Sequence, residues 1–309
     1  MTRLHLSIAL VLAMAAPAMA QRSPAPRRDA ALERELAALA AQVRGQVGIY
    51  VRHLRTGVTA ELRADSTFPT ASMVKLPILA TLVDRVERGA LRWHDTLTYR
   101  DSLLYPGEDI LGSFRDGARL PLNQAALLMI TTSDNTASLW LQQLVGTGAA
   151  VNDWLAARGF SRTRVNSRTP GREEARAQYG WGQTTPREMA ELLVRIREGR
   201  AVGPAAYQEM YRVLTRIYWN GEALSQLPPW VQAAAKQGAV DRSKSEVVLV
   251  NGPSGDYVFC VITMGQEDTR WVADNEGYLL LRRVSALLWR TFEPAHPYTP
   301  PPEAARWKP

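Results

Sequence analysis

The chain has 309 residues, of which 46% are hydrophobic and 22% are charged, and its formal net charge is +7. This composition excludes an intrinsically disordered, collagen-like or coiled-coil chain, because the apolar content is enough for a sizeable core. The single Cys excludes an internal disulfide, and the positive charge is spread along the chain, so we expect no nucleic-acid partner.

The first twenty residues have the pattern of a secretory signal peptide. Arg3 precedes an apolar run from Leu6 to Ala16, and the small-residue end Ala18-Met19-Ala20 precedes Gln21. The run is too short for a comfortable membrane span, and no other stretch is long enough. We therefore expect cleavage near Ala20 and a periplasmic or secreted protein without a stable membrane span.

Beyond residue 20, hydrophobic periodicity predicts strands, then a long helical stretch, then strands again. In chain order we expect a helix at 30–43, strands at 47–53 and 58–63, helices at 72–88, 121–131, 135–145, 151–158, 186–198 and 204–217, strands at 231–238, 247–251 and 257–263, and a helix at 274–292.

The two early and three late strands can pair into one sheet, which predicts an α+β fold. We expect a five-stranded antiparallel sheet flanked by helices, with an all-helical lobe beside it. Residues 21–64 and 222–293 are assigned to the sheet domain, 65–221 to the helical domain and 294–309 to a Pro-rich tail. A cleft between the two domains is the expected site.

The division of the positive charges is informative. Of the 37 Lys and Arg residues, only four are Lys: Lys75, Lys236, Lys244 and Lys308. Lys can lose its proton when it is buried and Arg effectively cannot, so a Lys in this chain can mark a position that needs a base. The alternative is a general preference for Arg with four chance exceptions.

The first candidate motif is Ser72-Met73-Val74-Lys75, which opens the helix predicted at 72–88. Its Ser and Lys share one helix face. Unpaired N–H groups at a helix start favour an oxyanion, and a desolvated Lys can take a proton from a nearby hydroxyl. The alternative is a capping Ser and a Lys in solvent.

The second candidate motif is Ser133-Asp134-Asn135, between two predicted helices. Ser133 or Asp134 can simply cap the following helix. The functional alternative is a second hydroxyl that relays a proton and an Asn amide that binds a substrate carbonyl.

The third candidate motif is Lys236-Gln237-Gly238, at the end of a predicted strand. A Lys on an edge strand beside a cleft can hold a carboxylate, and Gly lets a substrate backbone approach closely. The alternative is a Lys that protects a sheet edge.

Together and in this order, the three motifs resemble the Ser-x-x-Lys, Ser-Asp-Asn and Lys-Thr-Gly set of the class A β-lactamase-like serine hydrolases. The resemblance covers nearly all of residues 30–292. It includes Phe68-Pro69-Thr70 before the first motif and Thr184-Thr185-Pro186 at the start of a later helix. Two of the four Lys fall on motif positions.

The resemblance implies a role for each matching residue. Ser72 is then the acylated nucleophile, Lys75 its base, and Ser133 the group that passes a proton to the leaving nitrogen. Asn135 would hold a substrate amide. Lys236 would orient Ser133 and attract a substrate carboxylate.

The resemblance also implies an oxyanion hole and a close substrate approach. The backbone N–H groups of Ser72 and Ala239 would form the hole, and Gly238 would lie against the substrate. Gln237 departs from the family pattern, which has Thr or Ser there to help bind the carboxylate. Lys244 or Arg242 could supply a missing cation; the alternative for both is a solvated hairpin turn.

The larger departure lies in the segment 164–185. A class A enzyme has a Glu there that activates the deacylating water, and ungapped counting back from Pro186 puts Thr169 at that position. Glu173 and Glu174 follow shortly after. Either the segment is rebuilt so that one of them enters the site, or the carboxylate is absent and these are a solvated acidic pair.

The implied function is a serine hydrolase that opens β-lactams or related amides and esters through a Ser72 acyl-enzyme. The expected partner is a small-molecule β-lactam or a cell-wall peptide, and the expected state is a monomer. Few His and one Cys give no metal-ligand set, and we expect no metal and no cofactor. The alternatives are a D-alanyl-D-alanine peptidase of the penicillin-binding type and a degenerate penicillin-binding module without turnover.

Overall fold

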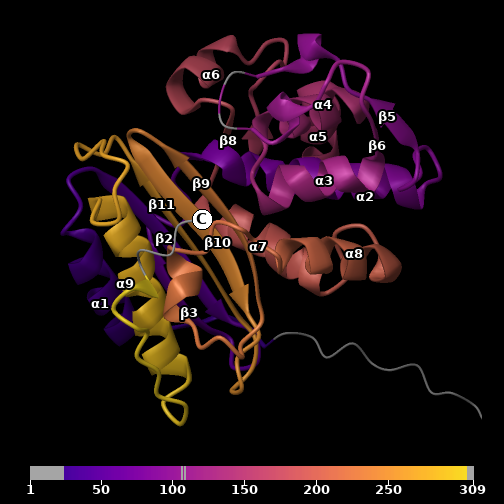
Figure 1. Ribbon diagram of the computed structural model, residues 1–309. Helices are drawn as coiled ribbons and strands as arrows, with labels where there is room; N and C mark the ends of the chain where they lie inside the picture. The colour runs from indigo at the N-terminus through magenta and orange to yellow at the C-terminus, as the bar shows by residue number, and fades with distance from the viewer. Residues whose placement is uncertain (1–23, 106, 108, 305–309) are drawn as a thin grey trace, which may run out of the picture.

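The computed structural model describes residues 24–105, 107 and 109–304, so the predicted signal peptide lies outside the described residues. Its centre is a six-stranded sheet in the order β1-β3-β2-β11-β10-β9 (Figure 1). The strands of this sheet are β1 (Arg27–Arg28), β2 (Gln46–His53), β3 (Val58–Leu62), β9 (Ala233–Val240), β10 (Ser243–Val250) and β11 (Tyr257–Met264).

Two smaller sheets lie outside this one. The first joins β4 (Phe68–Pro69), β8 (Gly182–Thr184) and β7 (Arg164–Val165), and the second pairs β5 (Thr96–Thr98) with β6 (Arg119–Pro121). The α-helices are α1 (Ala30–Ala40), α2 (Lys75–Glu87), α3 (Leu122–Thr131), α4 (Asn135–Leu144), α5 (Thr147–Ala156), α6 (Glu173–Tyr179), α7 (Pro186–Arg197), α8 (Pro204–Leu214) and α9 (Glu276–Phe292). Short 3₁₀ helices are η1 (Ala71–Val74), η2 (Asp101–Leu103), η3 (Leu111–Ser113) and η4 (Ala223–Gln226).

The predicted α+β class is confirmed, and the five predicted strands pair antiparallel. The strand count differs by one, because β1 adds a two-residue edge strand parallel to β3. A second difference is β10, which begins at Ser243 and not at 247. Its first residues look like a polar turn in sequence, yet all eight residues of the strand are buried.

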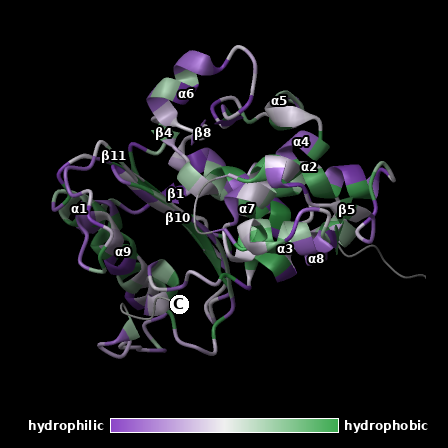
Figure 2. Ribbon diagram, turned by 45° about the horizontal axis from the view of Figure 1, so that its top comes forward, coloured by the Kyte–Doolittle hydropathy of each residue, from purple (hydrophilic) through white to green (hydrophobic). Residues whose placement is uncertain are grey.

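Helices cover both faces of the main sheet. α1 and α9 pack together and against β3 and β10, and α7 packs against β2, β10 and β11 from the other side. This double covering explains the continuous burial of β10, which a half-exposed sheet would not give. Figure 2 shows mainly hydrophobic residues along these central strands.

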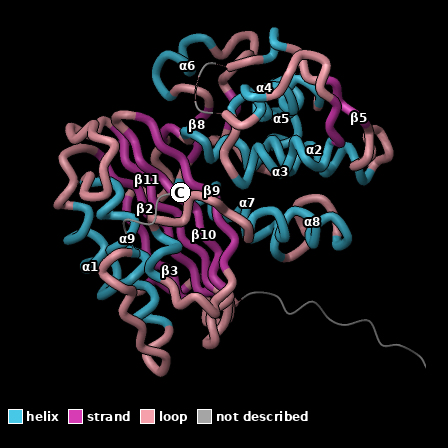
Figure 3. Tube along the Cα trace, in the orientation of Figure 1, coloured by secondary structure: helices cyan, strands magenta, loops and turns pink. Residues whose placement is uncertain are grey.

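The remaining helices form a lobe beside the sheet (Figure 3). α2 contacts α3, α4, α5 and α8, and most of its residues are buried, so it is the central helix of the lobe. The 3₁₀ turn η1 precedes α2 directly and contacts β9 and β10. The start of α2 therefore lies where the lobe meets the sheet edge. The assignment of residues 65–221 to a separate helical domain stays a prediction. Helix α7 falls within that range, but it packs on the main sheet.

The segment after α9 makes contacts with the sheet domain. Trp289 Nε1 donates to the His296 carbonyl at 2.8 Å, the Trp230 ring stacks edge-on against Trp289, and Ala304 is buried. The predicted Pro-rich tail is therefore held at His296 and buried at Ala304, while most of the residues between them are exposed. Within the described ranges, no helix is long and apolar enough to cross a membrane.

Candidate active site

Ser72 lies in η1, immediately before α2, and is partly exposed. The preceding residue, Ala71, has a φ of 43°, a left-handed conformation that costs a non-Gly residue energy. Such strain persists only where the surrounding fold imposes it, here between β4 and α2. The turn presents the Ser72 hydroxyl at the mouth of the cleft.

Lys75 is fully buried one turn later, and its Nζ has four close oxygen neighbours. It lies 2.9 Å from Ser72 Oγ, 3.0 Å from Ser133 Oγ, 2.5 Å from the Ser133 carbonyl and 2.8 Å from Asn135 Oδ1. A neutral amine can donate to the carbonyl and the amide oxygen and still accept a proton from a hydroxyl. Burial lowers the pKa of Lys75 to about 7, so the neutral form is accessible near neutral pH.

Ser133 and Asn135 reach Lys75 because the chain turns sharply between α3 and α4. Ser133 has a φ of 64°, and Asp134 caps α4 by accepting from the Ala137 N–H at 2.7 Å. The helix-cap interpretation is confirmed for Asp134, and it is compatible with the functional one, because the two neighbours of Asp134 face Lys75.

Lys236 enters the same cluster from β9. Its Nζ lies 3.1 Å from Ser133 Oγ, 2.9 Å from the Gln237 carbonyl and 2.9 Å from Gln237 Oε1. Complete burial holds the pKa of Lys236 well below its usual value, and the charge of Lys75 lowers it further. Ser133 Oγ thus joins two buried amines, which is the arrangement that a proton relay requires.

Gly238 lets the strand lie directly against the nucleophile turn. A Cβ at this position would be 2.6 Å from the Thr70 carbonyl and 2.9 Å from Ser72 N, so a side chain would push β9 away. Ala239 follows it and lines, with Ser72, both cavities beside the hydroxyl. Among the strands that the structure describes, β9 is the edge of the main sheet, so N–H groups on its outer side have no partner in these strands and can face a substrate.

Two cavities flank Ser72. The first, which we call the loop cavity, has about 470 Å³ and is lined by Tyr105, residues 178–181, Ala239 and Arg242. The second, which we call the Glu222 cavity, has about 400 Å³ and is lined by Ser133, Asn135, Gln237, Glu222 and Trp271 among others. Both volumes are in the range of small-molecule sites.

Four residues considered from the sequence do not line the cavities beside Ser72. Glu173 and Glu174 are exposed at the start of α6, a helix that the sequence did not predict, and neither lines either cavity. Lys244 is buried in β10, not in a solvated turn, and its Nζ donates to the Val240 carbonyl at 2.6 Å. Thr169 is buried and packs against Gly148. A Cβ added to Gly148 would lie 1.8 Å from Thr169 Oγ1.

Sequence reasoning missed Asp109, Glu222 and the rings that line the cavities. The Asp109 carboxylate accepts from the N–H groups of Asn135 and Thr136 at 2.9 and 2.8 Å, and so holds the start of α4. Tyr105 and Trp181 meet edge-on at 5.0 Å beside the loop cavity. These residues lie in irregular segments, where no periodicity or spacing marks them.

A buried acid lies behind Gln237. Glu246 on β10 is the register partner of Gln237, and its Oε2 accepts from the Ala223 N–H at 2.9 Å. Burial raises the pKa of Glu246 to about 8, and the charge of the neighbouring Glu222 contributes to this rise as the second cause. The carboxyl is therefore neutral at neutral pH.

Glu246→Gln is expected to stabilise the fold more at pH 8 than at pH 5. Between about 4.3, the ordinary pKa of Glu, and about 8, the folded chain keeps a proton that the unfolded chain loses, so wild-type stability falls as pH rises. The slope for one such proton is at most about 1.4 kcal/mol per pH unit. Urea unfolding at several pH values measures the difference, with the exposed Glu35→Gln as control; a pH-independent difference contradicts the neutral carboxyl.

Comparisons with known proteins agree with this geometry. A family model described as the β-lactamase enzyme family matches residues 31–292. A β-lactamase of Rhodobacter capsulatus is 24% identical over 278 residues, which cover 88% of this chain and 87% of that protein. The structure of PBP-A is 26% identical with a TM-score of 0.78 and covers 88% of this chain and 99% of that one. A single-residue mutant of PBP-A, solved as an acyl-enzyme complex with penicillin G, has the same identity, coverage and TM-score.

Proposed function

The chain belongs to the β-lactamase enzyme family and is a serine hydrolase of that type, and we propose that Ser72 is its nucleophile and that its acyl-enzyme is long-lived. The observation that carries the proposal is the contact of one buried amine, Lys75 Nζ, with both Ser72 Oγ and Ser133 Oγ. A site of this kind needs no metal ion or cofactor.

Acylation proceeds by proton transfer and attack. Neutral Lys75 takes the proton of Ser72, and Oγ attacks the substrate carbonyl while the N–H groups of Ser72 and Ala239 stabilise the oxyanion. When the C–N bond breaks, Ser133 gives its proton to the leaving nitrogen and regains one from Lys75. The product is a Ser72 ester and an amine, and no proton is gained or lost overall. The amine departs when the substrate is a peptide, and it stays attached to the acyl group when the substrate is a β-lactam.

Deacylation needs a water and a base on the acyl side of the site. Among the described residues, none that lines the loop cavity is Asp or Glu. Glu173 and Glu174 are held at the surface, where the Gly171 N–H donates to Glu173 at 3.1 Å. We propose that the acyl-enzyme therefore persists, as in penicillin-binding proteins.

A β-lactam fits the family as substrate, and a cell-wall peptide is the alternative that we propose beside it. The acyl-enzyme with penicillin G of the PBP-A mutant supports formation of a similar adduct here. The complete set of amine and hydroxyl contacts argues against a degenerate module, since each side chain of the relay has its partner. We also propose a monomer, and a periplasmic or secreted location, for which the leader-like residues 1–20 are the support.

Incubation with penicillin G is expected to give a Ser72 adduct that lasts for hours. Intact-protein mass followed over time measures it, with Glu173→Gln and Glu174→Gln beside the parent. Both variants are expected to match the parent, because both carboxylates are exposed and neither residue lines either cavity. A transient adduct with released product would contradict slow deacylation, and trapping in either variant would assign the base to that Glu. Absence of any adduct would contradict the proposed function.

A further inference from the structure

The segment from Tyr105 to Leu111 is tied to the start of α4 at both of its ends. The Tyr105 N–H donates to Thr136 Oγ1 at 3.0 Å, and the Leu111 N–H donates to Asp134 Oδ2 at 2.9 Å. Asp109 lies in the chain between these two contacts. The segment therefore brings a carboxylate to the first residues of α4, although the two are far apart in the sequence.

The Asp109 carboxylate uses both of its oxygens on α4. Oδ1 accepts from the Asn135 N–H at 2.9 Å, and Oδ2 accepts from the Thr136 N–H at 2.8 Å and from Thr136 Oγ1 at 3.0 Å. These bonds fix the backbone that carries the Asn135 side chain, whose Oδ1 lies 2.8 Å from Lys75 Nζ. Asp109 is thus one residue removed from the base of the proposed mechanism, and the inference below rests on that proposed function.

Asp109 also lies at the cleft itself. It is partly buried and lines the Glu222 cavity together with Ser72, Ser133 and Asn135. Charges in such a confined site interact more strongly than they do in bulk water. The negative charge of Asp109 therefore acts on the same small space in which the Ser72 proton is transferred.

Lys75 becomes an ammonium during acylation, because it takes the Ser72 proton. Burial disfavours this charge and lowers the pKa of Lys75 to about 7, while the negative charges of Asp109 and then Asp134 act in the opposite direction. Both carboxylates bind the start of α4, Asp134 through the Ala137 N–H. A carboxylate close to a buried ammonium offsets part of the cost of desolvation.

One cation opposes the two carboxylates. Lys236 enters from β9, and its Nζ lies 3.1 Å from the same Ser133 Oγ that lies 3.0 Å from Lys75 Nζ. The positive charge of one amine disfavours protonation of the other. The ammonium form of Lys75 therefore depends on negative charge supplied from the α4 side of the cleft.

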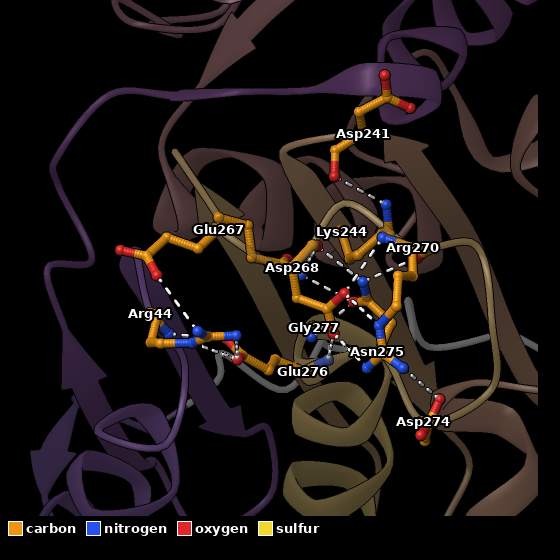
Figure 4. Close-up of polar contacts among 11 residues, drawn as sticks. Arg44, Asp241, Lys244, Glu267, Asp268, Arg270, Asp274, Asn275, Glu276 and Gly277 are labelled. Atoms are coloured by element: carbon orange, nitrogen blue, oxygen red, sulfur yellow. Dashed lines mark hydrogen bonds and ion pairs between the residues drawn. The ribbon is translucent and has the colours of Figure 1, made fainter.

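Two further charged groups near the cleft act on other partners. Lys244 Nζ donates to the carbonyls of Val240 and Asp241, as Figure 4 shows for Asp241, and Lys244 lines neither cavity. Glu222 lines the same cavity as Asp109, and its charge acts on the buried Glu246 carboxyl. Asp109 is thus the carboxylate of the Glu222 cavity that is bonded to the element carrying Asn135.

We propose that Asp109 is a positioning residue of acylation. Through the start of α4 it holds the Asn135 amide oxygen on the Lys75 amine, and its negative charge stabilises the ammonium that forms when Lys75 takes the Ser72 proton. The carboxylate itself takes no proton, so the proton balance of acylation is unchanged. Without this charge, Lys75 is a weaker base that stays neutral down to a lower pH.

The test measures rates of Ser72 adduct formation with penicillin G at pH 6 and pH 8, by intact-protein mass. Asp109→Asn keeps the shape of the side chain and removes its charge. The ratio of the rate at pH 6 to the rate at pH 8 is expected to rise about threefold over the parent, as a fall of the midpoint by about half a pH unit gives. The control is Asp101→Asn, a few residues earlier in an exposed position that lines neither cavity, and it is expected to leave the ratio unchanged.

Asp109→Ala separates the hold on α4 from the charge. It removes both carboxylate oxygens as well as the charge, so it is expected to share the changed ratio of Asp109→Asn. At pH 8 it is expected to react about tenfold more slowly than Asp109→Asn, the effect of one further hydrogen bond lost. Equal rates of the two variants at pH 8 would contradict the hold on Asn135.

The outcomes separate the inference from the proposed function. If Asp109→Asn leaves the ratio unchanged while the parent forms an adduct, the inference alone is overturned. Absence of any adduct in the parent overturns the proposed function and the inference with it. If Asp109→Asn does not fold by circular dichroism, Asp109→Ser supplies a neutral oxygen that also caps helices, and the same ratio decides. If no neutral variant at this position folds, the carboxylate is a structural group and the inference is overturned.

Discussion

Ser72→Ala is expected to abolish covalent labelling by penicillin G while the chain keeps its fold. The change removes the Oγ that lies 2.9 Å from Lys75 and little else, since the loss of one hydrogen bond costs about 1 kcal/mol. Intact-protein mass measures labelling, and circular dichroism checks the fold. Ser133→Ala is the matched control, because it removes the other hydroxyl bound to Lys75 but keeps the nucleophile.

Ser133→Ala is expected to label slowly and Ser72→Ala not at all. Equal labelling of Ser72→Ala and the parent would place the nucleophile elsewhere. Labelling of Ser72→Ala that disappears in the double variant with Ser133→Ala would assign the attack to the second hydroxyl.

Lys75→Arg is expected to slow acylation by about 10²–10⁴, the usual contribution of a general base. The charge stays, but a guanidinium cannot take the Ser72 proton. In the parent, the acylation rate is expected to rise with pH through about 7, because the pKa of Lys75 is lowered to that value and its neutral form is the base. The variant is expected to lose this rise.

The rate of acylation and its pH dependence together distinguish a general base from a fixed positive charge at position 75. Rates of Ser72 adduct formation between pH 5.5 and 8.5 are compared for the parent, Lys75→Arg and Lys75→Met, which removes the charge at similar chain length. If Lys75→Arg reacts within tenfold of the parent and keeps the pH profile, Lys75 acts through its charge alone. Equal slowing of both variants without loss of fold supports the base.

The sequence predicted the part of the site that depends on local spacing. Ser72 and Lys75 meet because positions i and i+3 share a helix face, and Ser133 falls in the break between two helices whose periodicity is visible. The antiparallel strands were also predictable, since β2, β3, β9 and β11 carry apolar runs between turn residues. These features depend on residues close together in the chain.

Only the tertiary structure decided which long-range neighbours complete the site. α6 holds Glu173 and Glu174 at the surface, and no local pattern distinguishes that arrangement from a segment that turns inward. Glu222 and Asp109 reach the cleft from irregular segments whose course is set by packing against β10 and α4.

The direction of Lys244 shows the physical reason most directly. Side chains alternate along a strand, so its neighbour Ser245 faces the cleft and its Oγ donates to the Gly238 carbonyl at 3.0 Å, while Lys244 faces Trp271 and α9. A shift of one residue in register would have reversed the two. Spacing along the chain placed Ser72 beside Lys75. The register of β10 in the folded sheet decided that Lys244 lines neither cavity beside Ser72, because strand register depends on pairing between distant segments.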